Sequence, residues 1–325
     1  MRPYQLLRPR SVEMAVEMMA AHLEAQYIAG GTNQIDMMKA GIHRPSHLVD
    51  IAGLGLDRIS DQGDVIRLGA LASNTVLATD PLVLEHVPMV SQTVLEGATQ
   101  QIRNAATTAG NILQRNRCPY FYVPGTRCNR KNPGSGCDAI GGFDRLNAIF
   151  GTSESCIAVM PSDLAIALRA YDARVRVIGP DGMRTIPFAD FHRPPGDTPE
   201  VETDLRKSEL ILSVDVPKAG RLASAYHKIR ERRSYAFALL SVGGAARLTD
   251  GRIAELRLAA GGVGTVPWRL PQVESALIDE APSQEAFQRA AALSRDGAVI
   301  GRQNAFKLPM LERAIVRVLT DITET

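Results

Sequence analysis

Four cysteines, all that the 325-residue chain contains, lie close together in the sequence: Cys118, Cys128, Cys137 and Cys156. Nine, eight and eighteen residues separate them, which differs from the paired two-residue spacing of zinc fingers and bacterial ferredoxins. Thiolates are ligands for zinc and for iron–sulfur clusters. The spacing leaves three interpretations open: a four-cysteine cluster, a structural zinc ion, and free thiols in an insertion loop.

The surroundings of the cysteines favour the cluster. Between about 118 and 151 the sequence is rich in Gly, Pro, Asn and Arg with little periodicity, so we expect a long loop that a metal or covalent link must hold. Five basic residues near the first two cysteines are expected to offset the negative charge of a cluster with four thiolates: Arg115, Arg117, Arg127, Arg130 and Lys131.

A glycine turn forms a second candidate site. Tyr27-Ile28-Ala29 has the composition of a short buried strand and leads into Gly30-Gly31-Thr32-Asn33. The glycines let backbone N–H groups approach a phosphate without Cβ atoms in the way, and Thr32 and Asn33 add side-chain donors. The motif lacks the third glycine of the dinucleotide fingerprint and the lysine of a P-loop, so a tight turn without a ligand is the alternative.

Three further features can contribute to the same site. Thr107-Thr108-Ala109-Gly110-Asn111 offers hydroxyls and a carboxamide that can lie against a diphosphate or a ring system, and the alternative is a close-packed turn. Ser162-Asp163 opens an apolar helical run, so Asp163 is either a helix cap or a ligand. Lys228 lies in a basic run and is either a solvated charge or a neighbour of an anionic ring.

Composition excludes several function classes. The 37 basic and 35 acidic residues are spread along the chain and give a net charge of +2, so we expect neither a nucleic acid partner nor an anionic membrane surface. No run of eighteen apolar residues predicts a membrane span, and the first ten residues lack the apolar segment of an export signal. We find no pattern of a Ser-His-Asp triad or paired catalytic carboxylates, and expect no catalytic side chain.

Helices and strands must position these residues. Helical spacing covers 11–23, 35–39, 76–79 with Thr75 as cap, 88–101 and 158–171, and strand-like spacing covers 27–29, 47–51, 65–71, 173–178 and 211–216. Farther along, strands are expected at 223–229, 236–248 and 253–261, and helices at 283–293 and 309–319. The pattern predicts an α+β protein with a first domain over 1–217, an insertion at about 115–157, and a smaller α+β domain over 218–325.

In order and spacing, these motifs resemble those of the FAD-binding medium subunits of molybdenum hydroxylases, the xanthine dehydrogenase family, and are most similar to the periplasmic aldehyde oxidoreductases of bacteria. The resemblance covers nearly the whole chain and is carried by 28–33, 101–104, 107–111, 161–163, and Lys228 with Arg230 and Arg233. It implies a two-subdomain FAD domain of the vanillyl-alcohol oxidase and p-cresol methylhydroxylase type. The C-terminal domain is implied to be of the carbon monoxide dehydrogenase flavoprotein type.

The resemblance also implies cofactors. FAD is expected between the domains, with Asp163 near its adenosine part and Lys228 near its isoalloxazine. The expected FAD-binding residues are Tyr27, Ile28, Ala29, Gly30, Gly31, Thr32, Asn33, Gln34, Ile35, Ala98, Thr107, Thr108, Gly110, Asn111, Ser162, Asp163 and Lys228. Related subunits with a similar cysteine loop bind a [4Fe–4S] cluster, so Cys118, Cys128, Cys137 and Cys156 are expected to be its ligands.

The implied partners are a large subunit with the molybdenum cofactor and a small subunit with [2Fe–2S] centres, in a heterotrimer or a dimer of it. The chain is then expected to pass electrons from them, after aldehyde oxidation, to an external acceptor. The alternative is a self-contained flavin-dependent oxidase. The chain is expected either in the periplasm, exported with a signal-bearing partner, or in the cytoplasm.

Overall fold

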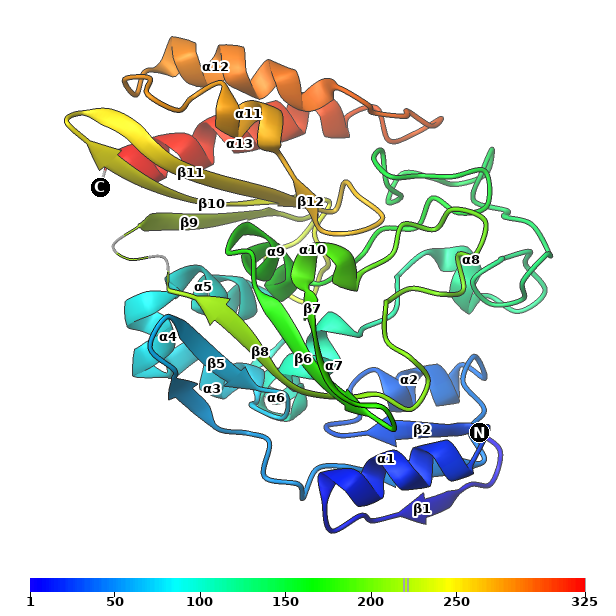
Figure 1. The fold of residues 1–325 in the computed structure, drawn as a ribbon. Coiled ribbons are helices and arrows are strands. Elements are labelled where there is room, and N and C mark those ends of the chain that lie inside the picture. Colours follow the sequence, from blue (N-terminus) through cyan, green and yellow to red (C-terminus); the bar gives the residue numbers. More distant parts are fainter. Residues whose placement is uncertain (219, 221, 325) are drawn as a thin grey trace.

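The computed structural model describes residues 1–218, 220 and 222–324; residues 219, 221 and 325, within the predicted second domain, lie outside the described part. The chain forms three layers, each built on its own sheet (Figure 1). The α+β class predicted from the sequence is confirmed, because separate parallel and antiparallel sheets are each covered by helices.

The first layer is a small parallel sheet of order β1-β3-β2. Its strands are β1 (Gln5–Leu7), β2 (Ala25–Ile28) and β3 (His47–Asp50), and its helices are α1 (Val12–Ala21) and α2 (Gln34–Lys39). The Ser11 side chain accepts a hydrogen bond from Met14 N and so caps α1, while Ala15, Val16 and Met19 form its buried face. The alternation of strand and helix agrees with the sequence prediction.

The middle layer is an antiparallel sheet of order β4-β5-β8-β6-β7. The strands are β4 (Ile59–Asp61), β5 (Val65–Gly69), β6 (Arg174–Gly179), β7 (Gly182–Pro187) and β8 (Leu210–Pro217). The helices are α3 (Asn74–Thr79), α4 (Pro81–His86), α5 (Pro88–Glu96), α6 (Gln100–Ala105), α7 (Thr108–Ile112), α9 (Asp163–Ala170) and α10 (Phe188–Phe191).

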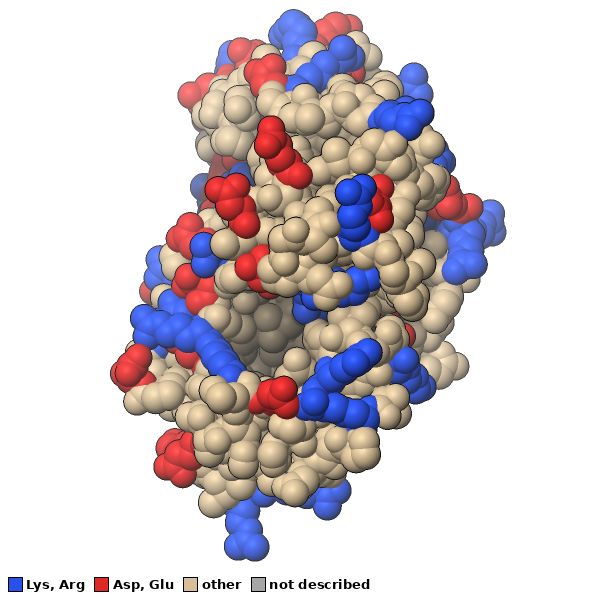
Figure 2. Space-filling view, turned by 90° about the vertical axis from the view of Figure 1, so that its right-hand side faces the viewer, with Lys and Arg blue, Asp and Glu red and all other residues tan. Residues whose placement is uncertain are grey.

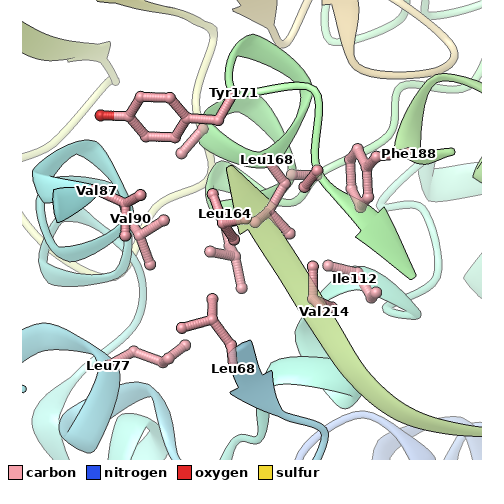
Figure 3. Packing of buried hydrophobic residues seen from close by; sticks show 14 of the residues in the cluster. Leu68, Leu77, Val87, Val90, Ile112, Leu164, Leu168, Tyr171, Phe188 and Val214 are labelled. Carbon is pink, nitrogen blue, oxygen red and sulfur yellow. The ribbon is translucent and has the colours of Figure 1, made fainter. Parts of the chain in front are cut away.

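The core of the middle layer lies between its sheet and its helices. Leu68 of β5 and Val214 of β8 meet Leu77 of α3, Ile112 of α7 and Leu164 of α9 (Figure 3), and all five are fully buried. Because β5 and β8 are neighbours although about two fifths of the chain separates them, this sheet closes the first domain around the cysteine segment.

The third layer has the sheet order β12-β11-β10-β9. Its strands are β9 (Ala223–Ile229), β10 (Leu240–Thr249), β11 (Arg252–Gly261) and β12 (Trp268–Arg269), and its helices are α11 (Pro271–Ser275), α12 (Gln284–Ala292), the 3₁₀ turn η1 (Leu293–Arg295) and α13 (Lys307–Thr323). Helix α13 packs on β10, where a Cβ at Gly244 would come within 2.6 Å of Val318. The opposite face meets α5 and α9, so the domains share a continuous interface.

Four sequence predictions for single elements are wrong in detail. The helix predicted over 88–101 is two helices, α5 and α6, because Ala98 has a left-handed φ of 50° and Thr99 caps a new helix. Ser73, and not Thr75, caps α3. The helix predicted over 158–171 begins only at Asp163, and the strand predicted over 236–248 begins at Leu240.

Candidate cofactor site

A cavity of about 860 Å³ lies where the three layers meet. Its walls come from the glycine turn, α2, α5, α7, the start of α9, β9 and the turn after β11. A volume of several hundred Å³ with mixed polar and apolar walls is typical of a site for a large organic cofactor.

The glycine turn is in direct contact with the end of α6, which leads into the second small-residue stretch. A Cβ at Gly30 would lie 1.6 Å from the backbone oxygen of Ala105, so only glycine permits this approach. Gly31 has a φ of 71°, the left-handed region that glycine adopts without strain. The two stretches that the sequence indicated separately therefore form one wall.

Hydrogen bonds fix the polar side chains of that wall. Asn33 Oδ1 accepts from the backbone N–H of Arg115 at 3.0 Å, and Ser162 Oγ donates to Asn111 Oδ1 at 2.7 Å. The Nδ2 of Asn33 and the Oδ1 of Asn74 line the cavity buried and without a hydrogen-bond partner among the described residues. Buried amides seldom stay unpaired, so this donor and this acceptor fit the polar groups of a bound cofactor.

Asp163 and Lys228 form a buried ion pair in the cavity wall. Because the two side chains are in contact, the expectation that they lie near different ends of FAD is wrong. Lys228 Nζ lies 2.7 Å from Asp163 Oδ2 and also donates to the carbonyl of Glu96, and Tyr226 Oη donates to Asp163 Oδ1 at 2.5 Å. Burial, followed by the charge of Asp163, raises the pKa of Tyr226 well above its usual value, so it stays a donor. The pair joins α9, α5 and β9 across the domain boundary.

The structure divides the predicted cofactor residues into two groups. Those that line the cavity are Gly31, Thr32, Asn33, Ile35, Ala98, Gly110, Asn111, Ser162, Asp163 and Lys228. Those behind the walls are Tyr27, Ile28, Ala29, Gly30, Gln34, Thr107 and Thr108. Several of the second group hold the first in place: Thr107 Oγ1 accepts from Gly110 N, and Thr108 Oγ1 donates to the carbonyl of Ala72.

Sequence reasoning missed a large part of the cavity, above all 231–239, the loop between β9 and β10. There the Arg117 guanidinium lies between two rings, 4.8 Å from the centroid of Phe237 and 5.8 Å from that of Tyr122. Figure 2 shows a hollow on one face of the molecule with lysine and arginine side chains at its edges. The sequence signal for this wall was the basic run around Lys228, and its alternative interpretation was a set of solvated surface charges.

The four cysteines gather in a second, smaller cluster beside the cavity. Cys118, Cys128 and Cys156 are buried, Cys137 is half-buried, and all four are free thiols. They pack with Met37, Phe121, Ala139 and Ala158, so the predicted loop has a short helix, α8 (Pro119–Tyr122), and a small apolar core of its own. Cys118 also lines the large cavity. Burial, followed by the other cysteines, raises the pKa of Cys118 to about 11, so its thiol is neutral at pH 7 without a bound cation.

The five basic residues near the first two cysteines have partners of their own. Arg127 pairs with Asp138, Arg117 with Asp36, Arg115 with Glu202, and Lys131 Nζ donates to nearby carbonyls. Arg130 is the one of the five with a recorded bond to sulfur, and it reaches the last cysteine: its Nε donates to Cys156 Sγ at 3.1 Å.

Among the described residues, no group of three or more His, Cys, Asp or Glu side chains is placed around one point as ligands of a single metal ion. A compact tetrahedral zinc site is therefore not preformed.

Two family models match the chain. Residues 2–219 match the FAD binding domain in molybdopterin dehydrogenase, and residues 224–322 match the CO dehydrogenase flavoprotein C-terminal domain. The chain belongs to the FAD-binding subunits of the molybdenum hydroxylases. The cavity, with its glycine approach and unpaired amides, fits the FAD that this family binds.

The sequence identity of this chain differs between members of the molybdenum hydroxylase family. It is 45% identical over 300 residues to the aldehyde oxidoreductase FAD-binding subunit PaoB of Escherichia coli, which covers 91% of both chains. It is 25% identical to the putative xanthine dehydrogenase FAD-binding subunit XdhB of the same organism, over 82% of this chain and 76% of that one.

The fold is shared with solved members of the family. A chain of carbon monoxide dehydrogenase from Hydrogenophaga pseudoflava superposes with a TM-score of 0.78 at 22% identity, over 99% of this chain and 97% of that one. The chain is therefore an oxidoreductase subunit of this family. The related chain of carbon monoxide dehydrogenase from Hydrogenophaga pseudoflava is itself named a medium chain. None of the helices in the described residues has the length and apolar character needed to cross a membrane.

Proposed function

We propose that this chain is the FAD- and [4Fe–4S]-carrying subunit of a molybdenum-dependent aldehyde oxidoreductase, and that it passes electrons from the molybdenum and [2Fe–2S] subunits to an external acceptor. The aldehyde substrate rests on the 45% identity to an aldehyde oxidoreductase subunit. The observation that carries the cofactor assignment is the meeting of the glycine turn, the 107–111 stretch and Asp163 around one cavity.

Bound FAD supplies the exchange of two electrons with partner centres and acceptor. The chain's residues hold and orient it. Gly31 lets the backbone approach the diphosphate closely, Gly30 lets the turn pack on Ala105 behind it, and the free Nδ2 of Asn33 supplies a donor on the same wall. Lys228, fixed by Asp163 and the Glu96 carbonyl, places a positive charge in the wall of the same cavity.

The four thiols are the proposed ligands of the cluster. Four free cysteines gathered in one buried cluster match the four-thiolate ligand set that such a cluster would need. Cys118 would be the ligand nearest the flavin, because it belongs to both the thiol cluster and the cavity wall.

Cofactor analysis of the anaerobically purified complex tests the proposal. We expect about one FAD, four iron and four sulfide for each copy of this chain beyond the content of the other subunits. Aldehyde oxidation should require the large subunit, and removal of this chain should abolish reduction of the external acceptor. Aldehyde oxidation by the isolated chain would instead establish a self-contained flavin oxidase.

A further inference from the structure

A buried cation touches one of the four thiols. The side chain of Arg130 is only 6% exposed, its Nε donates to Cys156 Sγ at 3.1 Å, and its Nη1 lies 2.8 Å from Glu202 Oε1. The carboxylate of Glu202 also pairs with Arg115, whose Nε is 3.0 Å away. The Glu202 carboxylate therefore pairs with two guanidinium groups, and one of them, that of Arg130, also donates a hydrogen bond to Cys156 Sγ.

The charges of this group do not balance without an anion at Cys156. Arg115 and Arg130 contribute two positive charges and Glu202 one negative charge. His43, whose Nε2 contacts Arg115, adds none, because burial lowers its pKa to about 4. Arg115 is 21% exposed and partly solvated, but Arg130 is nearly fully buried and shares the carboxylate with which it pairs, so its charge is costly there. A thiolate bound to a metal centre would supply the missing negative charge where Arg130 points.

We infer that Arg130 is the residue that raises the reduction potential of the group bound at Cys156, and that Glu202 is its counter-charge and moderates this effect. The inference rests on the proposed cluster. Taking up one electron adds one negative charge to the cluster, which the guanidinium stabilises and the carboxylate destabilises. Hydrogen bonds to cluster sulfurs and nearby charge are known determinants of such potentials.

The chain offers a matched control. Arg127 lies in the same loop and also pairs with a carboxylate, that of Asp138, but its side chain is 70% exposed and it has no recorded contact with sulfur. Arg127→Met therefore makes the same chemical change in the same segment without removing a buried charge beside a ligand.

The test is a redox titration of the full chain, with dithionite as the one-electron reductant and the spectrum of the reduced cluster as readout. Arg130→Met should shift the midpoint potential downward, Arg130→Lys less so, Glu202→Gln upward, and Arg127→Met hardly at all. Opposite shifts at Arg130 and Glu202 cannot come from general loosening of the loop. Arg130→Met removes a buried ion-pair partner. If this variant does not fold, the potentials of Arg130→Lys and Glu202→Gln test the inference.

Shifts of the same sign for Arg130→Met and Glu202→Gln, or shifts no larger than that of Arg127→Met, would overturn the inference while leaving the cluster in place. Wild-type chain without iron and sulfide would overturn the cluster assignment, and the inference with it. FAD content is measured on the same samples. Chain that holds FAD but no iron or sulfide contradicts the cluster alone, whereas chain without FAD contradicts the flavin assignment.

Discussion

Asp163 and Lys228 depend on each other because both are buried at the wall of the FAD cavity. Their side chains are 12% and 2% exposed. Lys228→Met should leave a buried carboxylate with Tyr226 as its remaining recorded partner, which costs about 3–5 kcal/mol of unfolding free energy. Urea unfolding measures this change. The control is Lys218→Met, whose ion pair with Asp61 is at the surface and should cost about 0–1 kcal/mol. Equal losses would show that the buried pair is no more important than the surface pair.

Gly30 is the point where the glycine turn contacts Ala105, just before the 107–111 stretch. A methyl group there would overlap the Ala105 carbonyl, so Gly30→Ala should force the turn away from 105–111 and weaken FAD binding by at least about tenfold, equivalent to ~1.4 kcal/mol. Flavin per chain and titration of the apo chain with FAD measure the effect. Gly53→Ala, with no atom within 4 Å of the new Cβ, is the control and should keep full FAD content.

At the scale of elements, α13 begins with a buried lysine. Lys307 Nζ donates to the carbonyls of Leu146, Asn147 and Gly262, which ties the cysteine segment and the turn after β11 to this helix. Burial, with a smaller effect from Arg145, lowers the pKa of Lys307 to about 7.

The lowered pKa of Lys307 predicts a pH dependence of stability. Between pH 7 and 10.5 the unfolded chain binds more protons at this residue, so its penalty is greatest below pH 7 and fades as the pH rises. Its contribution to the unfolding free energy should therefore increase with pH, by up to about 1.4 kcal/mol per unit. Urea unfolding from pH 7.5 to 9.5 should show a smaller slope for Lys307→Met than for wild type. The exposed Lys207→Met controls for loss of a lysine, and identical slopes would refute the prediction.

Elements with local signals were predictable from the sequence. The Ser11 cap and the apolar spacing behind it located α1, and Ser283 did the same for α12. The break between α5 and α6 was not predictable, because the left-handed Ala98 is held by its surroundings and not by its own preference. Strand β7 was missed because it is an edge strand with mostly exposed residues, which lack the alternation of a half-buried strand.

The same distinction applies to the candidate site. The glycine turn and 107–111 carry their chemistry in adjacent residues, so their composition indicated a site. Asn74 and Asn147 line the cavity only because the fold brings α3 and the cysteine segment beside the turn. No single-sequence pattern records that proximity, since each asparagine by itself is typical of a cap or a loop.

At the scale of the molecule, the FAD cavity is shared by both domains, so FAD should stabilise them together. Removing FAD is expected to lower the melting temperature, and restoring it at one hundred times its Kd should raise the unfolding free energy by about 2.7 kcal/mol. Scanning calorimetry of apo and reconstituted chain measures this. FMN lacks the adenosine part expected near Asp163 and should stabilise less. Equal stabilisation by FMN would show that the adenosine part of FAD contributes nothing to the stability of the chain.

The clamp between the cysteine segment and the last part of the chain has a consequence for biosynthesis. Asp144 accepts hydrogen bonds from the backbone N–H groups of Arg302 and Gln303, and Lys307 holds the carbonyls that follow. These partners leave the ribosome long after the cysteines do. The cysteine segment therefore takes its clamped position only after the C-terminal domain has been made, and a chain that stopped before residue 302 would leave Asp144 without these two donors.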